Sequence, residues 1–471
     1  MDDTTTRRDW LRLASAGAAA LQLRAQTAPP SGALEMRLTA GGARFAAQPA
    51  IPWEPLRGRA AKTIRIDPSS QYQEMIGFGA AFTDAACWTF NRLAEDARQK
   101  LFHELFHPSQ LGLGAGRLCI GSSDYATSMY SFDDGPPDPG LQHFSIDHDR
   151  DYILPMLRLA RKMNPDLFLF ASPWSPPGWM KDNGTMLGGT MRKQSFPAYA
   201  RYFVKFLQAY REAGVPVNAV SVQNEVDAEQ EGKMPACLWA QEQEWQFVGD
   251  HLGPAFARDK IDSKIWILDH NYDLWGRVLD ILAKPEVNRY IDGVAWHGYV
   301  GEPSAMTRVH DAYPAKHMYW TEGGPAITQP DYQTDWAKWG ATFAEILRNW
   351  ARCIIGWNLA LDEKGKPNIG PFSCGGAVTI DSATNAITRS GQYWALAHYS
   401  SAIRRGARRI GSQGEIEKVS HVAFVNPDGA AVVVLANQGA ERDVAVEADG
   451  RAARIHLPAD SLATLTCSLP A

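Results

Sequence analysis

Short apolar runs recur along the middle of the chain, separated by amphipathic stretches, and this repeat restricts the possible folds more than any other feature. Alternating strand-like and helix-like segments predict repeated βα units that share one parallel sheet. Eight such units close a barrel, and residues 71–389 are long enough for a (β/α)8 TIM barrel, an α/β fold, with insertions. The eight runs are QEMIGFGAAFTD, GLGAGRLCIGSSD, LFLFASPWSPP, VNAVSVQNE, KIWILDHN, DGVAWHGY, HMYWTEGG and CIIGWNLALD.

The segments on either side of the predicted barrel have a β pattern. Residues 26–70 contain short strand-like stretches with turns. Residues 390–471 contain VSHVAFVNPDGAAVVVLANQG, in which the sequence Pro-Asp-Gly at 427–429 predicts a turn between two strands. We therefore expect an all-β side domain beside the barrel. The basic run RRGARR at 404–409 is interpreted as a solvated connector between the domains.

The N-terminus predicts an export signal. Residues 1–25 contain Arg7 and Arg8, followed by an Ala/Leu-rich run that is too short to span a bilayer, and the segment resembles a twin-arginine signal peptide. Cleavage near Ala25 would release an exported protein, periplasmic or secreted; the alternative is an uncleaved disordered tail. No later apolar run is long enough for a transmembrane segment, and the six Cys form no CxxC pair.

Each of the eight runs becomes polar at its C-terminal end. In a barrel these ends lie on one face, where the active sites of this fold are built. Each residue alone also has a structural interpretation, because Asp84 can cap the following helix and His297 can be a hydrogen-bonded core histidine. Eight coincident polar ends favour a functional site. The residues are Asp84, Asp124, Trp174 with Ser175, Asn224 with Glu225, Asp269 with His270, His297 with Tyr299, Glu322, and Trp357 with Asn358.

Two of these ends carry glutamates, Glu225 on the fourth run and Glu322 on the seventh. Glycoside hydrolysis requires such a pair, because a neutral carboxyl group protonates the leaving oxygen while an ionised one attacks the anomeric carbon or activates water. Glu225 follows an amide and an apolar strand, which is consistent with a raised pKa and the acid/base role, but the residues alone leave the assignment open. Tyr299 is expected to donate a hydrogen bond to Glu322. Since two carboxyl groups complete the reaction, no metal or organic cofactor is expected.

The chain resembles glycoside hydrolase family 30, in particular its glucosylceramidase branch. The motifs that carry the resemblance are GFGAAFTDAA at 77–86, ASPWSPPGWMKDNG at 171–184, ARYFVKFLQAY at 200–210, QNE at 223–225, TEGG at 321–324 and GWNLALDEKGKPN at 356–368. Their order and spacing extend over nearly the whole predicted barrel. The resemblance also implies that the N-terminal and C-terminal β segments join in a single side sandwich.

The resemblance implies a role for each matching residue. Glu225 would be the acid/base and Glu322 the nucleophile of a retaining enzyme. The subsite for the non-reducing sugar would be lined by Asp84, Trp174, Asn224, His297, Tyr299, Trp357 and Asn368.

The predicted activity is retaining hydrolysis of terminal β-D-glucosidic bonds. Where the glucosylceramidase branch has Pro after the acid/base, this chain has Val226, followed by an acidic loop. This difference keeps other β-glycosidase activities open: an endo- or exo-acting β-1,6-glucanase, or a β-xylosidase. Substrates would be β-linked glucosides, oligosaccharides or glycolipids. We also expect Trp179, Trp239 and Trp245 to lie toward the leaving-group side.

Other classes of function are less well supported by the sequence. A net charge of −5 spread over both signs gives no reason to expect nucleic acid as a partner. The sequence HELFH at 103–107 matches the H-E-x-x-H pattern of zinc peptidases, but Pro108 follows at once, where that motif needs a continuing helix. A non-catalytic sugar-binding protein would be expected to lack one of the two glutamates.

Overall fold

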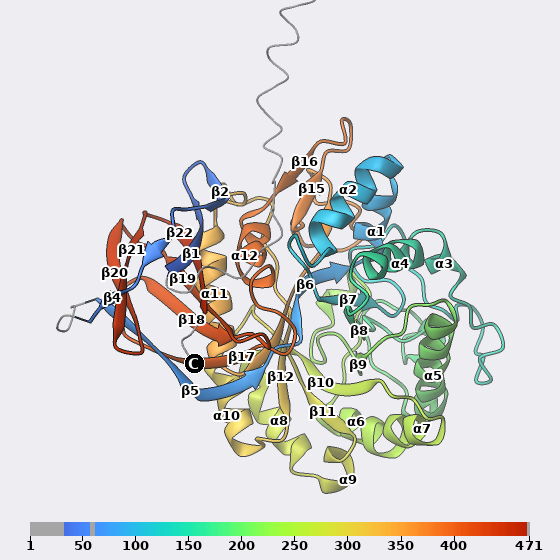
Figure 1. Cartoon of the computed structure of the whole chain (residues 1–471). Coiled ribbons are helices and arrows are strands. Elements are labelled where there is room, and N and C mark those ends of the chain that lie inside the picture. Colours follow the sequence, from blue (N-terminus) through green and yellow to red (C-terminus); the bar gives the residue numbers. More distant parts are fainter. Residues whose placement is uncertain (1–32, 57–61, 469–471) are drawn as a thin grey trace, which may run out of the picture.

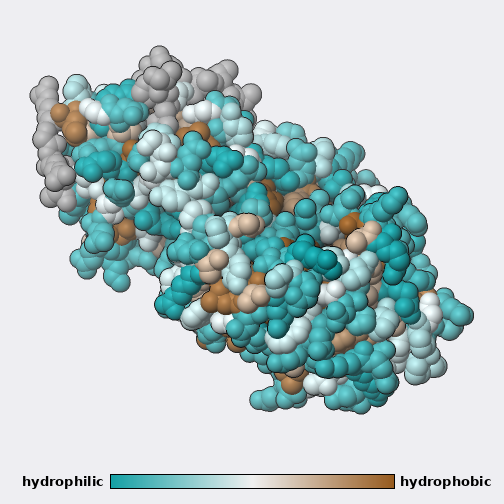
Figure 2. Space-filling view, turned by 90° about the horizontal axis from the view of Figure 1, so that it is seen from below, coloured by the Kyte–Doolittle hydropathy of each residue, from teal (hydrophilic) through white to brown (hydrophobic). Residues whose placement is uncertain are grey.

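The computed structural model describes residues 33–56 and 62–468, so the predicted signal peptide lies outside the described residues. Two lobes lie side by side in Figure 1, a barrel surrounded by helices and a β domain. Among the helices that the structure describes, none has the length and apolarity that a membrane span requires. The face drawn in Figure 2 is mostly hydrophilic, with small apolar patches separated by polar residues.

The eight predicted strands form a closed parallel barrel, which confirms the fold expected from the sequence repeat. Neighbouring strands follow chain order, and the last closes against the first. Several strands are buried along their whole length, because side chains fill the interior and helices cover the outside. The strands are β6 (Gly77–Phe82), β7 (Ala115–Cys119), β8 (Phe168–Ser172), β9 (Ala219–Ser221), β10 (Lys264–Asn271), β11 (Ile291–His297), β12 (His317–Glu322) and β13 (Ala351–Gly356).

Amphipathic helices cover the barrel. In the longest described one, α5, Pro197 lies in the first turn and Phe203, Phe206 and Tyr210 are buried on one face, while Gly214 follows the end at a φ of +79°. The helices are α1 (Asp84–Asn91), α2 (Glu95–Phe106), α3 (Asp147–Arg150), α4 (Ile153–Met163), α5 (Phe196–Glu212), α6 (Gln241–Gln246), α7 (Gly253–Arg258), α8 (Trp275–Leu282), α9 (Pro285–Asn288), α10 (Ser304–Ala312), α11 (Trp336–Arg348) and α12 (Gly391–Ser400).

The N-terminal and C-terminal β segments form one side domain, as the resemblance implies. β1 pairs with β22, and β5 pairs with β17, so both ends of the chain contribute to the same continuous sheet. Its strands are β1 (Ala33–Ala40), β2 (Ala43–Ala47), β3 (Ile51–Pro52), β4 (Glu54–Pro55), β5 (Thr63–Glu74), β17 (Arg408–Gln413), β18 (Val419–Val425), β19 (Ala430–Asn437), β20 (Arg442–Ala448), β21 (Arg451–Leu457) and β22 (Ser461–Ser468). A smaller sheet contains β14 (Ala360–Leu361), β15 (Val378–Ile380) and β16 (Ile387–Arg389).

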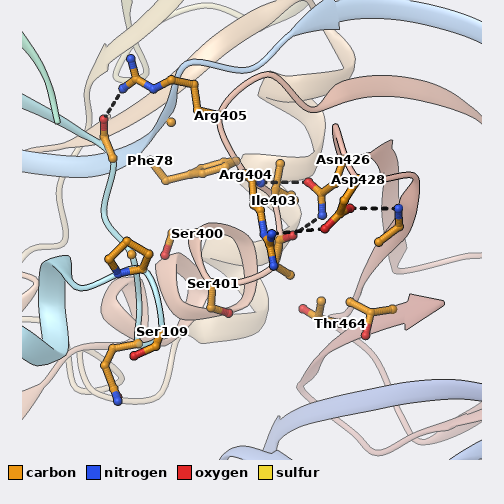
Figure 3. A pocket seen from close by; sticks show the side chains of 18 of the residues that line it. Phe78, Ser109, Ser400, Ser401, Ile403, Arg404, Arg405, Asn426, Asp428 and Thr464 are labelled. Carbon is orange, nitrogen blue, oxygen red and sulfur yellow. Dashed lines mark hydrogen bonds and ion pairs between the residues drawn. The ribbon is translucent and has the colours of Figure 1, made fainter. Parts of the chain in front are cut away.

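Buried polar contacts join the two lobes. α11 and α12 contact barrel strands and side-domain strands. The His398 ring on α12 lies 2.8 Å from the hydroxyl of Thr464 and 2.9 Å from that of Thr39, and burial lowers the pKa of His398 to about 3. A cleft of about 920 Å³ also lies at this junction (Figure 3), but none of the predicted catalytic or sugar-binding residues lines it.

The basic run at 404–409 is only partly a solvated connector. Arg404 is exposed and pairs with Asp428. Arg409 is 6% exposed, stacks 3.6 Å from the centre of the Tyr72 ring and donates to Gln73, and burial lowers its pKa to about 10. The prediction was therefore wrong for Arg409, because its side chain on β17 is buried against Tyr72 and Gln73 of β5.

Candidate active site

Most of the predicted site residues meet at the C-terminal end of the barrel. His297 on β11 lies between the two glutamates. One ring nitrogen faces Glu225, which follows β9, and the other faces Glu322 on β12. Tyr299 and Asn224 join the same group through hydrogen bonds. Parallel strands bring these residues together, because their C-terminal ends lie on one face.

An irregularity in β10 adds two side chains to this site. Leu268 and Asp269 have φ values of 72° and 48°, and the register with β11 shifts between Leu268 and His270. In a regular strand Asp269 and His270 would point to opposite faces. Here Asp269 contacts His297, and His270 contacts Glu225. Such bulges are common beside active sites, where they redirect side chains.

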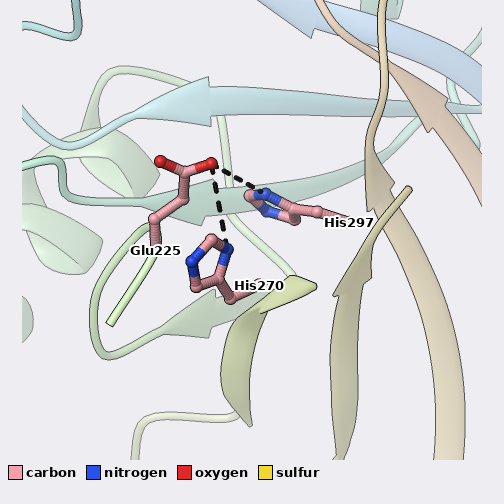
Figure 4. A group of neighbouring side chains, drawn as sticks. All are labelled: Glu225, His270 and His297. Carbon is pink, nitrogen blue, oxygen red and sulfur yellow. Dashed lines mark ion pairs between the residues drawn. The ribbon is translucent and has the colours of Figure 1, made fainter. Parts of the chain in front are cut away.

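Glu225 has a constrained backbone and a crowded carboxylate. Its φ of 54° lies in the left-handed region, which costs a non-glycine residue about 1–3 kcal/mol and is concentrated at functional sites. The carboxylate accepts a hydrogen bond of 3.1 Å from Gln230. Its Oε1 lies 3.6 Å from His297 Nδ1 and 3.8 Å from His270 Nδ1 (Figure 4).

The expectation of a raised pKa for Glu225 was wrong. Burial by itself raises the pKa of Glu225, but the adjacent His297 and His270 outweigh burial and lower it. Burial lowers the pKa of His297, whereas Glu322, Asp269 and Glu225 raise it to about 9. Without substrate, these shifts favour a proton on His297 over one on Glu225. The sequence around Glu225 does not predict the lowered pKa, because both histidines come from other strands.

Glu322 is held by three neighbouring groups. The Tyr299 hydroxyl donates a hydrogen bond of 3.0 Å to Oε1, as the sequence predicted. Arg117 forms an ion pair with Oε2, and His297 Nε2 lies 3.8 Å from the same oxygen. Donor groups thus face both oxygens of Glu322 and fix the orientation of its carboxylate.

Asp269 connects β10 to five other strands. It is fully buried and accepts hydrogen bonds from Ser172 at 2.5 Å, Ser221 at 2.7 Å and Thr321 at 2.8 Å. Arg117 and His297 lie 2.8 Å and 3.1 Å away. Burial raises the pKa of Asp269, but these two groups outweigh burial and hold it well below its usual range. Asp269 therefore stabilises the arrangement of the barrel end beneath the glutamates.

Arg117 is a site residue that the sequence predictions missed. It lies on β7, is fully buried, and contacts Glu322, Asp269 and Asn224 at once. A charged residue inside an apolar strand run was the available signal, because a buried charge requires a partner. Which carboxylates it pairs with depends on the closure of the barrel.

We expect Arg117→Met to lower the free energy of unfolding by about 3–5 kcal/mol, since it leaves Asp269 buried without its main cation. Urea denaturation measures this loss. The control is Arg150→Met, which removes an exposed ion pair with Asp147 and should cost no more than about 1 kcal/mol. Equal stabilities of the two variants would contradict the assigned importance of Arg117.

Trp174 and Trp357 form an apolar wall beside these charges. Their ring centres are 5.0 Å apart and nearly parallel, and each residue is only 2% exposed. The Arg117 guanidinium lies 4.7 Å from the centre of the Trp174 ring. The indoles therefore line the site without forming an open stacking platform. Asn224 lies beside them, and its Oδ1 accepts a hydrogen bond of 2.7 Å from Arg117.

Asp84 and Asp124 have different settings. Asp84 accepts hydrogen bonds from Thr127, Tyr152 and His148, which belong to the connection after β7 and to its helices, so the structure does not join it to the glutamates. Asp124 is buried, and its pKa is raised well above the usual range by burial and by the nearby charges of Glu322 and Glu225. Asp124 is thus close enough to the two glutamates for their charges to raise its pKa.

Asn368 lies beside Asp124 in the loop after β14. Its amide donates to the carbonyl of Phe372 at 2.5 Å, and its Oδ1 accepts from the amide of Gly370 at 2.6 Å. The next residue, Ile369, donates its amide to the carbonyl of Asp124. The Asn368 side chain therefore shapes the loop at the edge of the site.

Comparison with known proteins identifies the family. Residues 75–403 match the glycosyl hydrolase family 30 TIM-barrel domain, and residues 406–465 match the family 30 beta sandwich domain. The chain belongs to glycoside hydrolase family 30. The matched barrel domain includes α12, which packs between the two lobes.

Relatives in family 30 act on different glucosides. An endo-1,6-beta-D-glucanase of Neurospora crassa is 33% identical over 407 residues, which cover 82% of this chain and 83% of that protein. The lysosomal acid glucosylceramidase of Mus musculus is 30% identical over 401 residues, covering 80% and 78% of the two chains. The solved structure of an endo-beta1,6-glucanase has a TM-score of 0.84 and 27% identity, and covers 93% of this chain and 100% of that one. This family 30 chain is therefore a glycoside hydrolase.

Other polar and aromatic residues of this family 30 chain are structural. Gln223 donates to the carbonyl oxygens of Trp174 and Asn224 and accepts from the Trp239 indole. These hydrogen bonds stabilise the segment that follows β9. Trp239 is 1% exposed and stacks on Phe196. The expectation that Trp239 lies on the leaving-group side was therefore wrong, because it packs in an aromatic core.

The HELFH segment of this family 30 chain has a structural role. α2 ends at Phe106, immediately before His107 and Pro108. Glu104 turns away from the two histidines and binds Arg389 and Tyr393. The glutamate of the motif is therefore used to attach α2 to α12 and β16.

Proposed function

We propose that this family 30 enzyme hydrolyses β-D-glucosidic bonds with retention of configuration. The observation that carries the proposal is the placement of Glu225 and Glu322 on opposite nitrogens of His297, at 3.6 Å from Nδ1 and 3.8 Å from Nε2. A pair of strand-end carboxylates beside several hydrogen-bond donors supports this proposal, because double displacement uses one carboxylate as nucleophile and one as acid/base.

Each glutamate has a separate role in the proposed mechanism. In the first step, Glu322 forms a bond to the anomeric carbon, the glycosidic bond breaks, and Glu225 passes the proton held by His297, 3.6 Å away, to the departing oxygen. In the second step, Glu225 takes a proton from water, which attacks the anomeric carbon and releases Glu322, and the proton returns to His297. Tyr299 and Arg117 hold the nucleophile between these steps.

The mouth of the site combines polar and apolar groups. Asp227 pairs with His270 and Gln230 donates a hydrogen bond to Glu225, so both border the proposed acid/base, and we expect the leaving group to depart on this side. Tyr299, Val300 and Phe372 are large apolar residues that are 47%, 51% and 43% exposed. Exposed rings can stack against a second sugar, and the charged Asp227 favours a hydroxylated leaving group over a lipid. We therefore propose short β-linked gluco-oligosaccharides, including β-1,6-linked ones, as substrates.

A substrate panel tests this proposal. We expect release of glucose from aryl β-glucosides and from β-1,6-linked gluco-oligosaccharides, with glucosylceramide cleaved at least about tenfold less efficiently in kcat/KM, which corresponds to about 1.4 kcal/mol in the transition state. Glucosylceramide is the second candidate, because a glucosylceramidase is among the relatives. A strong preference for glucosylceramide would overturn the oligosaccharide proposal, and exclusive release of xylose would overturn the glucose specificity.

A further inference from the structure

Three possible metal ligands converge beside the proposed acid/base. One possible ligand atom from each of Glu225, His270 and His297 lies within 4.8 Å of the other two, and Figure 4 shows the carboxylate oxygen facing both rings. The separations of 3.8 Å and 3.6 Å from Oε1 to the two nitrogens are longer than hydrogen bonds. In a tetrahedral zinc site, ligand atoms lie about 3.3 Å apart, so a shift of a few tenths of an ångström would bring each histidine into range of the carboxylate.

The two facing nitrogens have no hydrogen-bond partner. His270 Nδ1 and His297 Nδ1 are buried and unpaired among the described residues. The side chains of His270 and His297 are 9% and 0% exposed, so the two atoms are also largely shielded from water. Leaving a buried polar atom unpaired costs about 1–3 kcal/mol, which a bound cation would offset.

A carboxylate holds the far nitrogen of each histidine. His270 Nε2 lies 2.6 Å from Asp227, and His297 Nε2 lies 3.1 Å from Asp269. A carboxylate in this position orients the ring and holds a proton on Nε2, while a bound metal ion displaces the proton from Nδ1. Metal-binding histidines in proteins are commonly held in this way.

We propose that Glu225, His270 and His297 form a binding site for one zinc-class transition-metal ion, and that the ion inhibits the enzyme. Two imidazoles and one carboxylate, with a fourth position open to water, form a ligand set that Zn²⁺ accepts. The ion is an inhibitor because it occupies the carboxylate oxygen that has to carry the proton to the leaving group. This effect rests on the proposed acid/base role of Glu225, whereas binding of the ion does not.

Binding is tested on the full chain after EDTA treatment and dialysis. Calorimetric titration with ZnCl₂ should give one ion per chain, and CoCl₂ should give the intense visible bands of a four-coordinate ion. His270→Ala should weaken zinc binding at least about tenfold, and Asp227→Asn should also weaken it because the ring loses its support. The control is His103→Ala combined with His107→Ala, which removes the stacked histidine pair at the C-terminal end of α2.

The zinc titrations and the activity assays test the metal site separately from the proposed function. Zinc binding that is unchanged in His270→Ala, or lost in the α2 control, would overturn the site. For the wild type, EDTA should leave activity intact, and stoichiometric zinc should inhibit it reversibly. Full zinc occupancy without loss of activity would overturn the inhibitory role. If the metal-free enzyme cleaves no β-glycoside but binds zinc as described, the proposed function fails and the metal site remains.

Discussion

Replacing Glu322 with Gln should reduce kcat for every β-glucoside by about 10⁴-fold or more, since the amide cannot form the glycosyl ester on which double displacement depends. The change is nearly isosteric, and Tyr299 and Arg117 can still contact the side chain. Steady-state rates with an aryl β-glucoside measure the loss, and thermal unfolding checks that the variant remains folded.

Glu302→Gln is a suitable control for this variant. Glu302 is exposed in the loop between β11 and α10, and this change should leave kcat within about twofold of the wild type. A Glu322→Gln protein that is folded and retains a substantial part of its turnover would show that another residue is the nucleophile.

Replacing Glu225 with Gln should affect substrates according to their leaving groups. For an alkyl or sugar leaving group, kcat should fall by about 10²–10⁴-fold, because its oxygen requires protonation as the bond breaks. An activated aryl leaving group needs little protonation, so its first step should be nearly preserved and deglycosylation should become limiting. Azide should then accelerate turnover and yield a β-glycosyl azide, because an anion needs no general base.

Glu229→Gln tests whether these effects belong to Glu225. Glu229 is an exposed residue of the same loop, so the change alters local charge without touching the site. It should show neither the leaving-group dependence nor the azide effect. Equal losses for good and poor leaving groups in Glu225→Gln, without acceleration by azide, would contradict the acid/base assignment.

The sequence was sufficient to predict the barrel and most of the active-site face. The strands are short and buried, so each one produces a run of apolar residues, and the fold class determines which end carries function. Glu225, His297 and Glu322 were therefore predictable as neighbours. The hydrogen bond from Tyr299 to Glu322 followed from the same strand order.

Features that depend on contacts between several strands were not predictable. The role of Asp269 requires partners from five other strands, and the bulge that turns His270 toward Glu225 has no distinct signature in KIWILDHN. The pKa of Glu225 was predicted in the wrong direction because His297 and His270, which lower it, come from other strands. Trp239 was misplaced because an indole in a loop sequence can equally well be buried in a core.

The most direct test of the proposed mechanism is covalent labelling of the nucleophile. Incubation with a 2-deoxy-2-fluoro-β-glucoside that carries an activated leaving group should trap the glycosyl-enzyme, because the fluorine slows deglycosylation more than the activated first step. Mass spectrometry of the digested protein should place one sugar on Glu322, and Glu322→Gln should remain unlabelled. A label on any other residue, or an active enzyme that forms no covalent adduct and releases product with inverted configuration, would contradict the account.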